Sequence, residues 1–323
     1  MKKTFAVFAL LLIVAMALPA CAPAAPDCKS EDVVCVGLVT DVGKIDDKSF
    51  NQSAWEGVKQ AEKELGAKVQ YIETTDAKDY DKNIATFADE GYDAIVTVGF
   101  ALGDATAAAA KKYPDVDFIG VDQFQAWQFD DDATNDIANL TGLGFPEDQA
   151  GYLVGALAAM MSKTGKIGAV CGTDAVPPVW RFGEGYKAGA AYIDPAVEVN
   201  VVYHSDVGFD KTFVDPEWGA ATANSMMDKG VDVIFGCGGK TGNGAVIEAA
   251  AKGVYGIGVD TDQYFTLPEA APKLLSSAMK LITPGVAEML ALAKDAQAGG
   301  AAFPAGNFAG TAGYAPYHDL EDA

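Results

Sequence analysis

The chain alternates short apolar runs with helical patterns, and it does so in two successive series. In the first series, apolar runs at residues 33–40, 68–73, 94–99 and 117–121 alternate with segments whose apolar residues recur at helical spacing. A second series starts at residue 166 and ends near residue 259. This alternation predicts an α/β fold of two doubly wound lobes, each with a parallel sheet covered by helices.

The segments after residue 262 predict a return of the chain between the lobes. An apolar run at 274–280, a helix at 284–298 and a strand within 307–314 remain to be placed. We expect residues 33–142 with about 263–300 to form the first lobe. We expect residues 143–262 with about 301–323 to form the second.

The N-terminus has the pattern of a secretory signal peptide over residues 1–20. A short basic segment precedes an apolar run that is too short to span a bilayer comfortably. The following Leu18-Pro19-Ala20-Cys21 resembles a bacterial lipobox, which implies cleavage before Cys21 and lipid attached to it. Residues 21–32 would then be a lipidated tether. The alternative is an ordinary signal peptide with a chance Cys.

The charge balance excludes several kinds of partner. The net charge is −22 and Arg181 is the only arginine, so the chain should repel nucleic acid and anionic membrane surfaces. With His204 and His318 as the only histidines, we expect no metal site.

Four cysteines remain after Cys21, and their pairing is open. Cys28 and Cys35 flank the start of the first strand and could pair in an oxidising exterior. Cys171 and Cys237 each end a predicted strand. They could pair if these strands are neighbours, or remain buried thiols.

The loop at residues 41–51 joins the first strand to the first helix. Ligands of open parallel sheets lie at the carboxyl ends of strands, so this loop is well placed for binding. Asp46, Asp47 and Ser49 could simply cap the helix. The pair Phe50-Asn51 is not needed for capping, and an aromatic face beside an amide suits a planar ligand with polar edges.

Two strand ends are near repeats of each other. Asp122 and Asp260 each follow Ile-Gly-Val, at equivalent points of the two series. A carboxylate accepts two hydroxyl donors at once, as a ribose diol requires. The alternative is a pair of loop or helix caps.

The second series offers further candidates. Phe182 takes the place that Phe50 has in the first series, so two rings could enclose a purine; otherwise Phe182 is core and Trp180 or Phe209 stacks. Arg181 could pair with one of the many acids. The Gly-rich strand end around Gly238 lets the main chain approach a ligand. Lys280 could be a solvated lysine, and Phe100 is interpreted as part of an ordinary turn.

These motifs carry a family resemblance. The signature D-x-G-x-I-D-D-K-S-F-N-Q-x-A-W-E-G from Asp41, and R-F-x-x-G-[FY]-x-A-G from Arg181, resemble the basic membrane protein family. Its members are PnrA-like purine-nucleoside-binding lipoproteins of bacterial ABC importers. The resemblance implies the type I periplasmic binding protein fold, with interlobe crossings. It also implies ligand contacts from Asp41, Asp46, Phe50, Asn51, Asp122, Phe182, Gly238, Asp260 and Lys280.

The resemblance further implies a monomer without catalytic activity or cofactor, anchored by lipid to the cell membrane on its extracytoplasmic side, at the outer face or in the periplasm. Its partners would be permease subunits and a nucleoside such as inosine, guanosine or adenosine. Two alternatives stay open. One is a nucleoside hydrolase that uses the aspartates with a metal. The aspartates argue against it, because they lie singly at separate strand ends and not as a cluster. The other is a sensor without transport that binds another planar ligand, such as a flavin.

Overall fold

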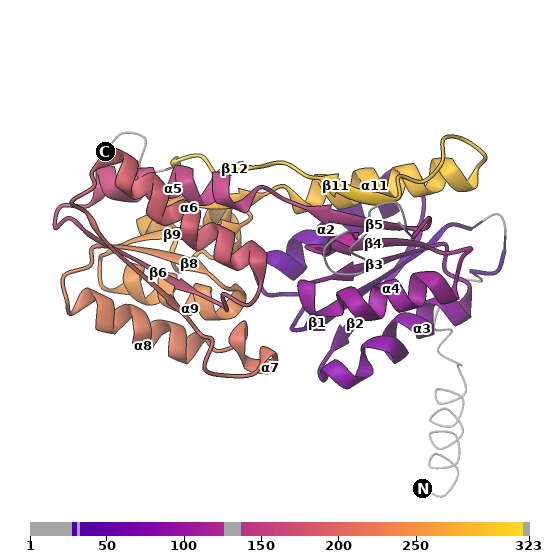
Figure 1. The fold of residues 1–323 in the computed structure, drawn as a ribbon, viewed down its shortest axis with the longest axis horizontal. Coiled ribbons are helices and arrows are strands. Elements are labelled where there is room, and N and C mark those ends of the chain that lie inside the picture. The colour runs from indigo at the N-terminus through magenta and orange to yellow at the C-terminus, as the bar shows by residue number, and fades with distance from the viewer. Residues whose placement is uncertain (1–27, 31–32, 126–136, 319–323) are drawn as a thin grey trace, which may run out of the picture.

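The computed structural model describes residues 28–30, 33–125 and 137–318. These residues form two lobes side by side, each built on a six-stranded sheet (Figure 1). Both faces of each sheet are covered by helices, and a hydrophobic core lies on each face. The predicted α/β class with two parallel-sheet lobes is confirmed.

The first sheet has the order β11-β5-β4-β3-β1-β2, and its paired strands run parallel. Strands β3 and β5 are buried along their whole length, which explains their continuous apolar character. The strands are β1 (Cys35–Val42), β2 (Lys68–Thr74), β3 (Ala94–Val98), β4 (Asp117–Val121), β5 (Leu140–Gly144) and β11 (Gly306–Ala309). The covering helices are α2 (Phe50–Leu65), α3 (Tyr80–Glu90), α4 (Gly103–Lys112) and α11 (Ile282–Gln297).

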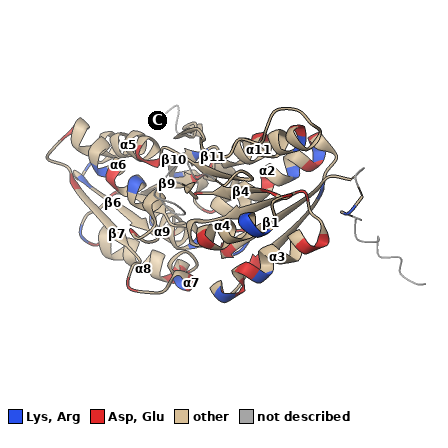
Figure 2. Ribbon diagram, turned by 45° about the vertical axis from the view of Figure 1, so that its right-hand side comes forward, with Lys and Arg blue, Asp and Glu red and all other residues tan. Residues whose placement is uncertain are grey.

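The second sheet has the order β12-β10-β9-β8-β6-β7, with only the β10–β12 pair antiparallel. Its strands are β6 (Lys166–Cys171), β7 (Glu198–Tyr203), β8 (Val233–Cys237), β9 (Tyr255–Asp260), β10 (Leu274–Lys280) and β12 (Ala312–Tyr314). Its helices are α5 (Glu147–Met161), α6 (Pro177–Ile193), α7 (Phe209–Thr212), α8 (Pro216–Met227), α9 (Gly239–Ala251) and α10 (Gln263–Thr266). In the first lobe, charged residues gather on helices such as α3 and α11, whereas the sheet carries few (Figure 2).

The chain crosses between the lobes at residues 144–147, 280–282 and 309–312. Two expected lobe assignments need correction. Strand β10 pairs with β9 in the second sheet, not the first, and β11 pairs with β5 in the first sheet, not the second. The single strand expected within residues 307–314 is two strands, one in each sheet. An apolar run predicts a buried strand, but its hydrogen-bonding neighbour is chosen by the tertiary fold.

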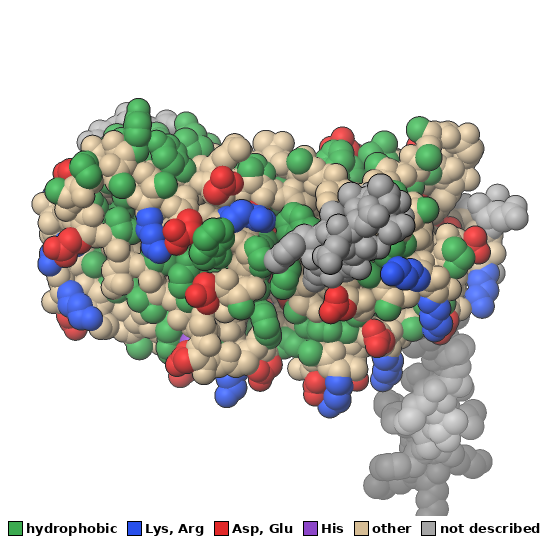
Figure 3. All heavy atoms as spheres, in the orientation of Figure 1, with side chains coloured by type: hydrophobic (Ala, Val, Ile, Leu, Met, Phe, Trp, Pro, Cys, Tyr) green, Lys and Arg blue, Asp and Glu red, His purple; other side chains and the backbone are tan. Residues whose placement is uncertain are grey.

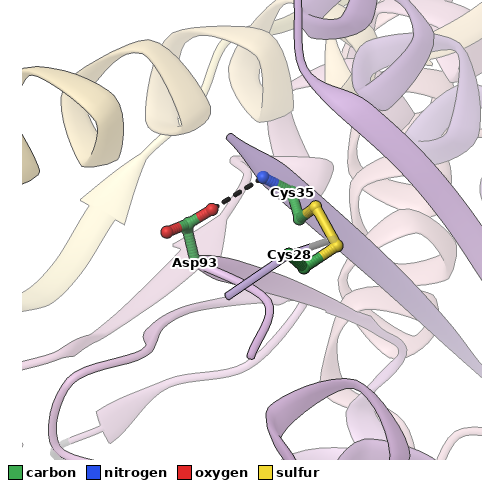
Figure 4. The surroundings of a disulfide bond; sticks show 3 residues. All are labelled: Cys28, Cys35 and Asp93. Atoms are coloured by element: carbon green, nitrogen blue, oxygen red, sulfur yellow. Dashed lines mark hydrogen bonds between the residues drawn. A yellow bond between two sulfur atoms is a disulfide. The ribbon is translucent and has the colours of Figure 1, made fainter. Parts of the chain in front are cut away.

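Two disulfides resolve the open cysteine pairings. Cys28 bonds to Cys35 and thereby fastens the segment before β1 to the first lobe (Figure 4). The Asp93 carboxylate accepts the Cys35 N–H at 2.7 Å beside it. Cys171 bonds to Cys237 because β6 and β8 are neighbours and these residues are in register.

Residues 1–27 lie outside the described part of the chain, and with them the expected signal peptide, Cys21 and most of the tether. Within the described residues, no helix has the length and apolar character to cross a membrane.

Candidate functional site

A cavity of about 780 Å³, counting the part that opens to solvent, lies between the lobes where the strands end. Hydrophobic side chains gather along the seam between the lobes on the face shown in Figure 3. The walls are contributed by both lobes: Asp41–Lys44, Asp47, Phe50, Asn51, Gly99–Ala101 and Asp122 from the first, and Val176, Pro178, Val179, Phe182, Phe209, Phe213, Val214, Cys237–Lys240, Val259, Asp260 and Lys280 from the second.

The first-lobe wall depends on two glycines that leave room for polar side chains. A Cβ at Gly99, whose φ is +115°, would lie 2.0 Å from Asp41 Oδ2. A Cβ at Gly43 would lie 2.9 Å from the Asn51 amide nitrogen. Asn51 donates through Nδ2 to the Lys44 carbonyl at 3.3 Å, while its buried Oδ1 has no partner among the described residues. Asn51 lines the cavity, so a buried acceptor without a partner lies within its wall.

Of the expected helix caps, Asp47 caps α2 and Ser49 does not. The Asp47 carboxylate accepts the backbone N–H groups of Ser49, Asn51 and Gln52 at 2.9, 2.9 and 3.1 Å, so Asp47 caps α2. Ser49 makes no side-chain cap bond. Its hydroxyl instead donates to Asp260 Oδ2, at 2.6 Å, in the other lobe.

Asp46 is not on the cavity wall where the resemblance placed it. Its side chain is 67% exposed, and the carboxylate lies 3.4 Å from the Lys240 ammonium of the second lobe. The structure therefore gives Asp46 an interlobe contact, because the loop turns its side chain toward solvent at the seam.

Asp122 and Asp260 reach the cavity from equivalent strand ends, Asp122 directly after β4 and Asp260 at the end of β9. Both are buried, and both have a left-handed backbone with φ of +60° and +65°. That conformation is uncommon for residues other than glycine and is typical of sites under functional constraint. Asp122 Oδ1 is buried without a partner among the described residues.

Lys280 lies at the centre of the site, at the end of β10, and only 4% of its surface is exposed. Its ammonium is 2.6 Å from Asp122 and 3.8 Å from both Asp260 and Glu147. Burial lowers the pKa of Lys280, but these three carboxylates outweigh it and hold the pKa above its ordinary value. Lys280 is therefore a buried cation and not a solvated lysine.

Aromatic rings surround the same ammonium. It lies 4.6 Å from the ring centroid of Phe50, 5.6 Å from that of Phe145 and 5.7 Å from that of Phe182. Cations are attracted to aromatic faces at such distances. The structure thus brings Phe50 and Phe182 to one point, as the sequence predicted, but with the Lys280 ammonium beside both.

Glu147 belongs to this cluster and was not predicted. It begins α5, is fully buried, and accepts a hydrogen bond from Arg181 Nε at 2.7 Å. Burial raises the pKa of Glu147 to about 7, against the opposing effects of Lys280 and Arg181. In the sequence, an acid in the first helical turn looks like an ordinary complement to the helix dipole. The one available indication was Arg181, which was expected to pair with an acid that the sequence did not identify.

Three other carboxyls of the site also have raised pKa values. Burial, with the nearby Asp47 and Asp122 carboxylates, raises the pKa of Asp41 to about 8. Burial raises the pKa of Asp47 to about 6, although its three backbone N–H donors oppose the shift. Burial raises the pKa of Asp260 as well, against Lys280 and Ser49. Near neutral pH, Asp41 is therefore largely a neutral acid, able to donate as well as accept a hydrogen bond.

The second lobe offers two kinds of aromatic side chain. Phe182 is 2% exposed and packs edge-on against Phe235 in the core, with part of its surface on the cavity. Phe209 lines the cavity and is 44% exposed, whereas the exposed Trp180 does not line it.

Phe100, interpreted from the sequence as part of a turn, also lines the cavity. Gly238 does so through its backbone, where a Cβ would lie 2.4 Å from Gly172 N.

Two lobes on parallel sheets, with a polar and aromatic cavity between their strand ends, define a solute-binding protein of the type I periplasmic class. A solved solute-binding protein of an ABC transporter system from Aeropyrum pernix K1 has this fold. Its TM-score is 0.75 at 29% identity, over 88% of this chain and 76% of that one. Within the described residues, no group of three or more His, Cys, Asp or Glu is arranged to hold a metal ion.

Residues 34–301 match the Bmp family, described as PnrA-like ABC transporter substrate-binding proteins. The chain belongs to this family. It is 36% identical over 282 residues to a "CD4+ T-cell-stimulating antigen" of Listeria innocua, covering 81% of this chain and 74% of the relative. It is 35% identical over 240 residues to the "ABC transporter nucleoside-binding protein BmpA" of Lactococcus lactis, covering 71% of this chain and 64% of the relative.

Proposed function

We propose that this protein binds a purine nucleoside in the interlobe cavity and delivers it to the permease subunits of an ABC importer. The proposal rests on the residues that line one cavity. Phenylalanine rings from both lobes lie there together with the buried Asp122, Asp260 and Lys280. Rings stack on a planar base, and carboxylates accept ribose hydroxyls. The Lactococcus relative is named a nucleoside-binding protein, which supports this ligand class.

The proposed assignment of ligand contacts follows the cavity wall. Phe50 and one second-lobe ring, Phe182 or Phe209, enclose the base. Asn51 Oδ1, Asp41 and the Gly238 backbone face its polar edge, and Asp122, Asp260 and Lys280 face the ribose. The unpartnered oxygens of Asn51 and Asp122 support this division because a ligand donor would satisfy both.

The protein is proposed to act outside the cytoplasm as a monomer held to the membrane by lipid on Cys21. The sequence around Cys21 is the support for the anchor. The proposed role is binding without catalysis. One Asp122 oxygen is bonded to Lys280 and one Asp260 oxygen to Ser49, so these carboxylates are engaged with protein donors and not presented as a free acid–base pair.

The test uses inosine on the purified protein freed of small molecules. Calorimetry should show one inosine bound per chain, and chromatography of the same mixture should recover inosine intact. Release of hypoxanthine would show the hydrolase alternative instead. Absence of binding to inosine, guanosine and adenosine would overturn the proposal.

A further inference from the structure

Four consecutive residues of the first lobe each contact the second lobe. The segment 46–49 lies in the loop between β1 and α2, within the motif that looked like a helix cap or ligand loop. Its contacts run to α9, α10 and β9: Asp46 to Lys240, Asp47 carbonyl to Asn243, Lys48 carbonyl to Gln263 and Thr266, and Ser49 hydroxyl to Asp260 and the Val259 carbonyl.

The backbone of Lys48 is shaped for this contact. Its φ is +65°, a left-handed conformation that costs free energy in a lysine. In that conformation its carbonyl accepts Gln263 Nε2 at 3.0 Å and Thr266 Oγ1 at 2.8 Å. The strained backbone is thus held by donors from the opposite lobe.

The partners in the second lobe are prearranged. Gln263 is fully buried, and its Oε1 accepts the Val259 N–H at 3.0 Å, which fixes the orientation of the amide. Its Nε2 donates both to Lys48 and to Asn243 Oδ1, the latter at 2.8 Å. Asn243 in turn donates through Nδ2 to the Asp47 carbonyl at 2.8 Å. Gln263 and Asn243 form a rigid receptor because each amide is oriented by the other.

The segment directly precedes Phe50 and Asn51 of the cavity wall. When its contacts form, the Phe50 ring lies beside Lys280 and the Ser49 hydroxyl reaches Asp260. The contacts therefore set the closed position of the first-lobe wall over the cavity.

We propose that residues 46–49 are an interlobe latch, received by Asn243, Gln263 and Thr266, which holds the cleft closed and retains the ligand. The latch residues touch the opposite lobe, whereas Asp41 in β1 and Phe50 and Asn51 at the start of α2 line the cavity. Retention of a nucleoside rests on the proposed function, but closure of the lobes does not. Weakening the latch should speed ligand release more than it slows capture, since capture takes place in the open state.

The test compares two double variants. The latch variant combines Thr266→Val with Asn243→Ala. It removes the two side-chain donors that bind the Lys48 and Asp47 carbonyls, and Thr266→Val keeps the shape of the side chain. The matched control is Thr266→Ser, which keeps the hydroxyl, with Asn224→Ala, which removes an asparagine bonded to Glu248 inside the second lobe. Stopped-flow with inosine should show dissociation at least about tenfold faster in the latch variant, with association changed by less than about threefold. Equal dissociation rates in the two variants would overturn the proposal.

The radius of gyration reports the closure of the lobes, and a general loss of stability would not change it while the protein stays folded. Small-angle scattering at a temperature where both variants are folded should give a larger radius of gyration for the latch variant than for its control. If native protein does not bind inosine, the proposed function fails, and scattering of the ligand-free variants decides alone. A larger radius in the latch variant supports the latch, and equal radii contradict it.

Discussion

The Lys280 ammonium lies 2.6 Å from the Asp122 carboxylate, and this ion pair joins the last residue of β10 in the second lobe to the end of β4 in the first. Both side chains are almost fully buried. A charge in such a place depends on its partner, because water cannot replace it. The centre of the site is thus also a connection between the lobes.

Replacing Lys280 by Met should be costly. Asp122, Asp260 and Glu147 would share a buried site without their common cation. Removal of one partner of a buried pair costs about 3–5 kcal/mol. We expect the free energy of unfolding, measured in urea, to fall by about this amount. The control is Lys240→Met, which breaks the exposed Lys240–Asp46 pair and should cost less than about 1 kcal/mol. Equal losses in the two variants would argue against a central role for Lys280.

Phe50→Ala tests stacking in the first lobe. Its ring lines the cavity, and base stacking contributes about 1–3 kcal/mol for any base. Calorimetry should therefore show a similar loss of affinity for inosine, guanosine and adenosine. The exposed Phe265, outside this cavity, provides the control variant Phe265→Ala. A loss confined to one nucleoside would mean that Phe50 reads the base edge instead of stacking on it.

Phe182 and Phe209 should separate stability from binding. Phe182 is packed in the second-lobe core, so Phe182→Ala should lower the free energy of unfolding by about 3–5 kcal/mol. Phe209 is 44% exposed, so Phe209→Ala should change stability by less than about 0.5 kcal/mol. Loss of inosine affinity in folded Phe209→Ala would identify it as the second-lobe stacking ring. Unchanged affinity would leave that role to Phe182.

The stability of the ligand-free protein should fall as pH rises from about 5 to about 8. Burial raises the pKa of Asp41 to about 8 and that of Glu147 to about 7, whereas both titrate near about 4 in the unfolded chain. Between these values the folded state binds more protons, so the free energy of unfolding decreases with pH.

The variant Asp41→Asn isolates one of these groups. It should raise the melting temperature at about pH 8, where Asp41 is deprotonating in the folded state, and have less effect at about pH 5. Thermal unfolding at both pH values provides the measurement. An equal effect at both would show that Asp41 does not titrate with a raised pKa.

Much of the fold could be predicted from the sequence, because the spacing of apolar residues and the length of apolar runs identify amphipathic helices and buried strands. Strand β4 has its predicted bounds, and the second series begins at Lys166 with β6, as predicted. The partners of β10 and β11 could not be predicted, because an apolar run does not specify its neighbour. The repeat of Ile-Gly-Val before Asp122 and Asp260 did indicate that both reach one cavity.

Other parts of the site were hidden because the residues involved have common structural uses. Glu147 resembles a helix-start acid, and Ser49 resembles a cap. Gln263 and Asn243 lie on helices where their amides gave no signal. Their roles depend on contacts between residues about 200 positions apart, such as the 196-residue separation of Asp47 and Asn243. Such contacts appear only when the lobes are placed together.

We predict that a purine nucleoside is held in the interlobe cavity by both ring stacking and Asp260. Calorimetry with inosine, deoxyinosine and hypoxanthine, on the native protein and on Asp260→Ala, separates the two contributions. We predict that native protein prefers inosine, and that Asp260→Ala loses about 1.5–3 kcal/mol for inosine and most of its preference over hypoxanthine. Native protein that binds riboflavin but none of the three purines would show that the cavity takes another planar ligand. Asp260→Ala with undiminished affinity and the native ranking would show that Asp260 does not bind the sugar.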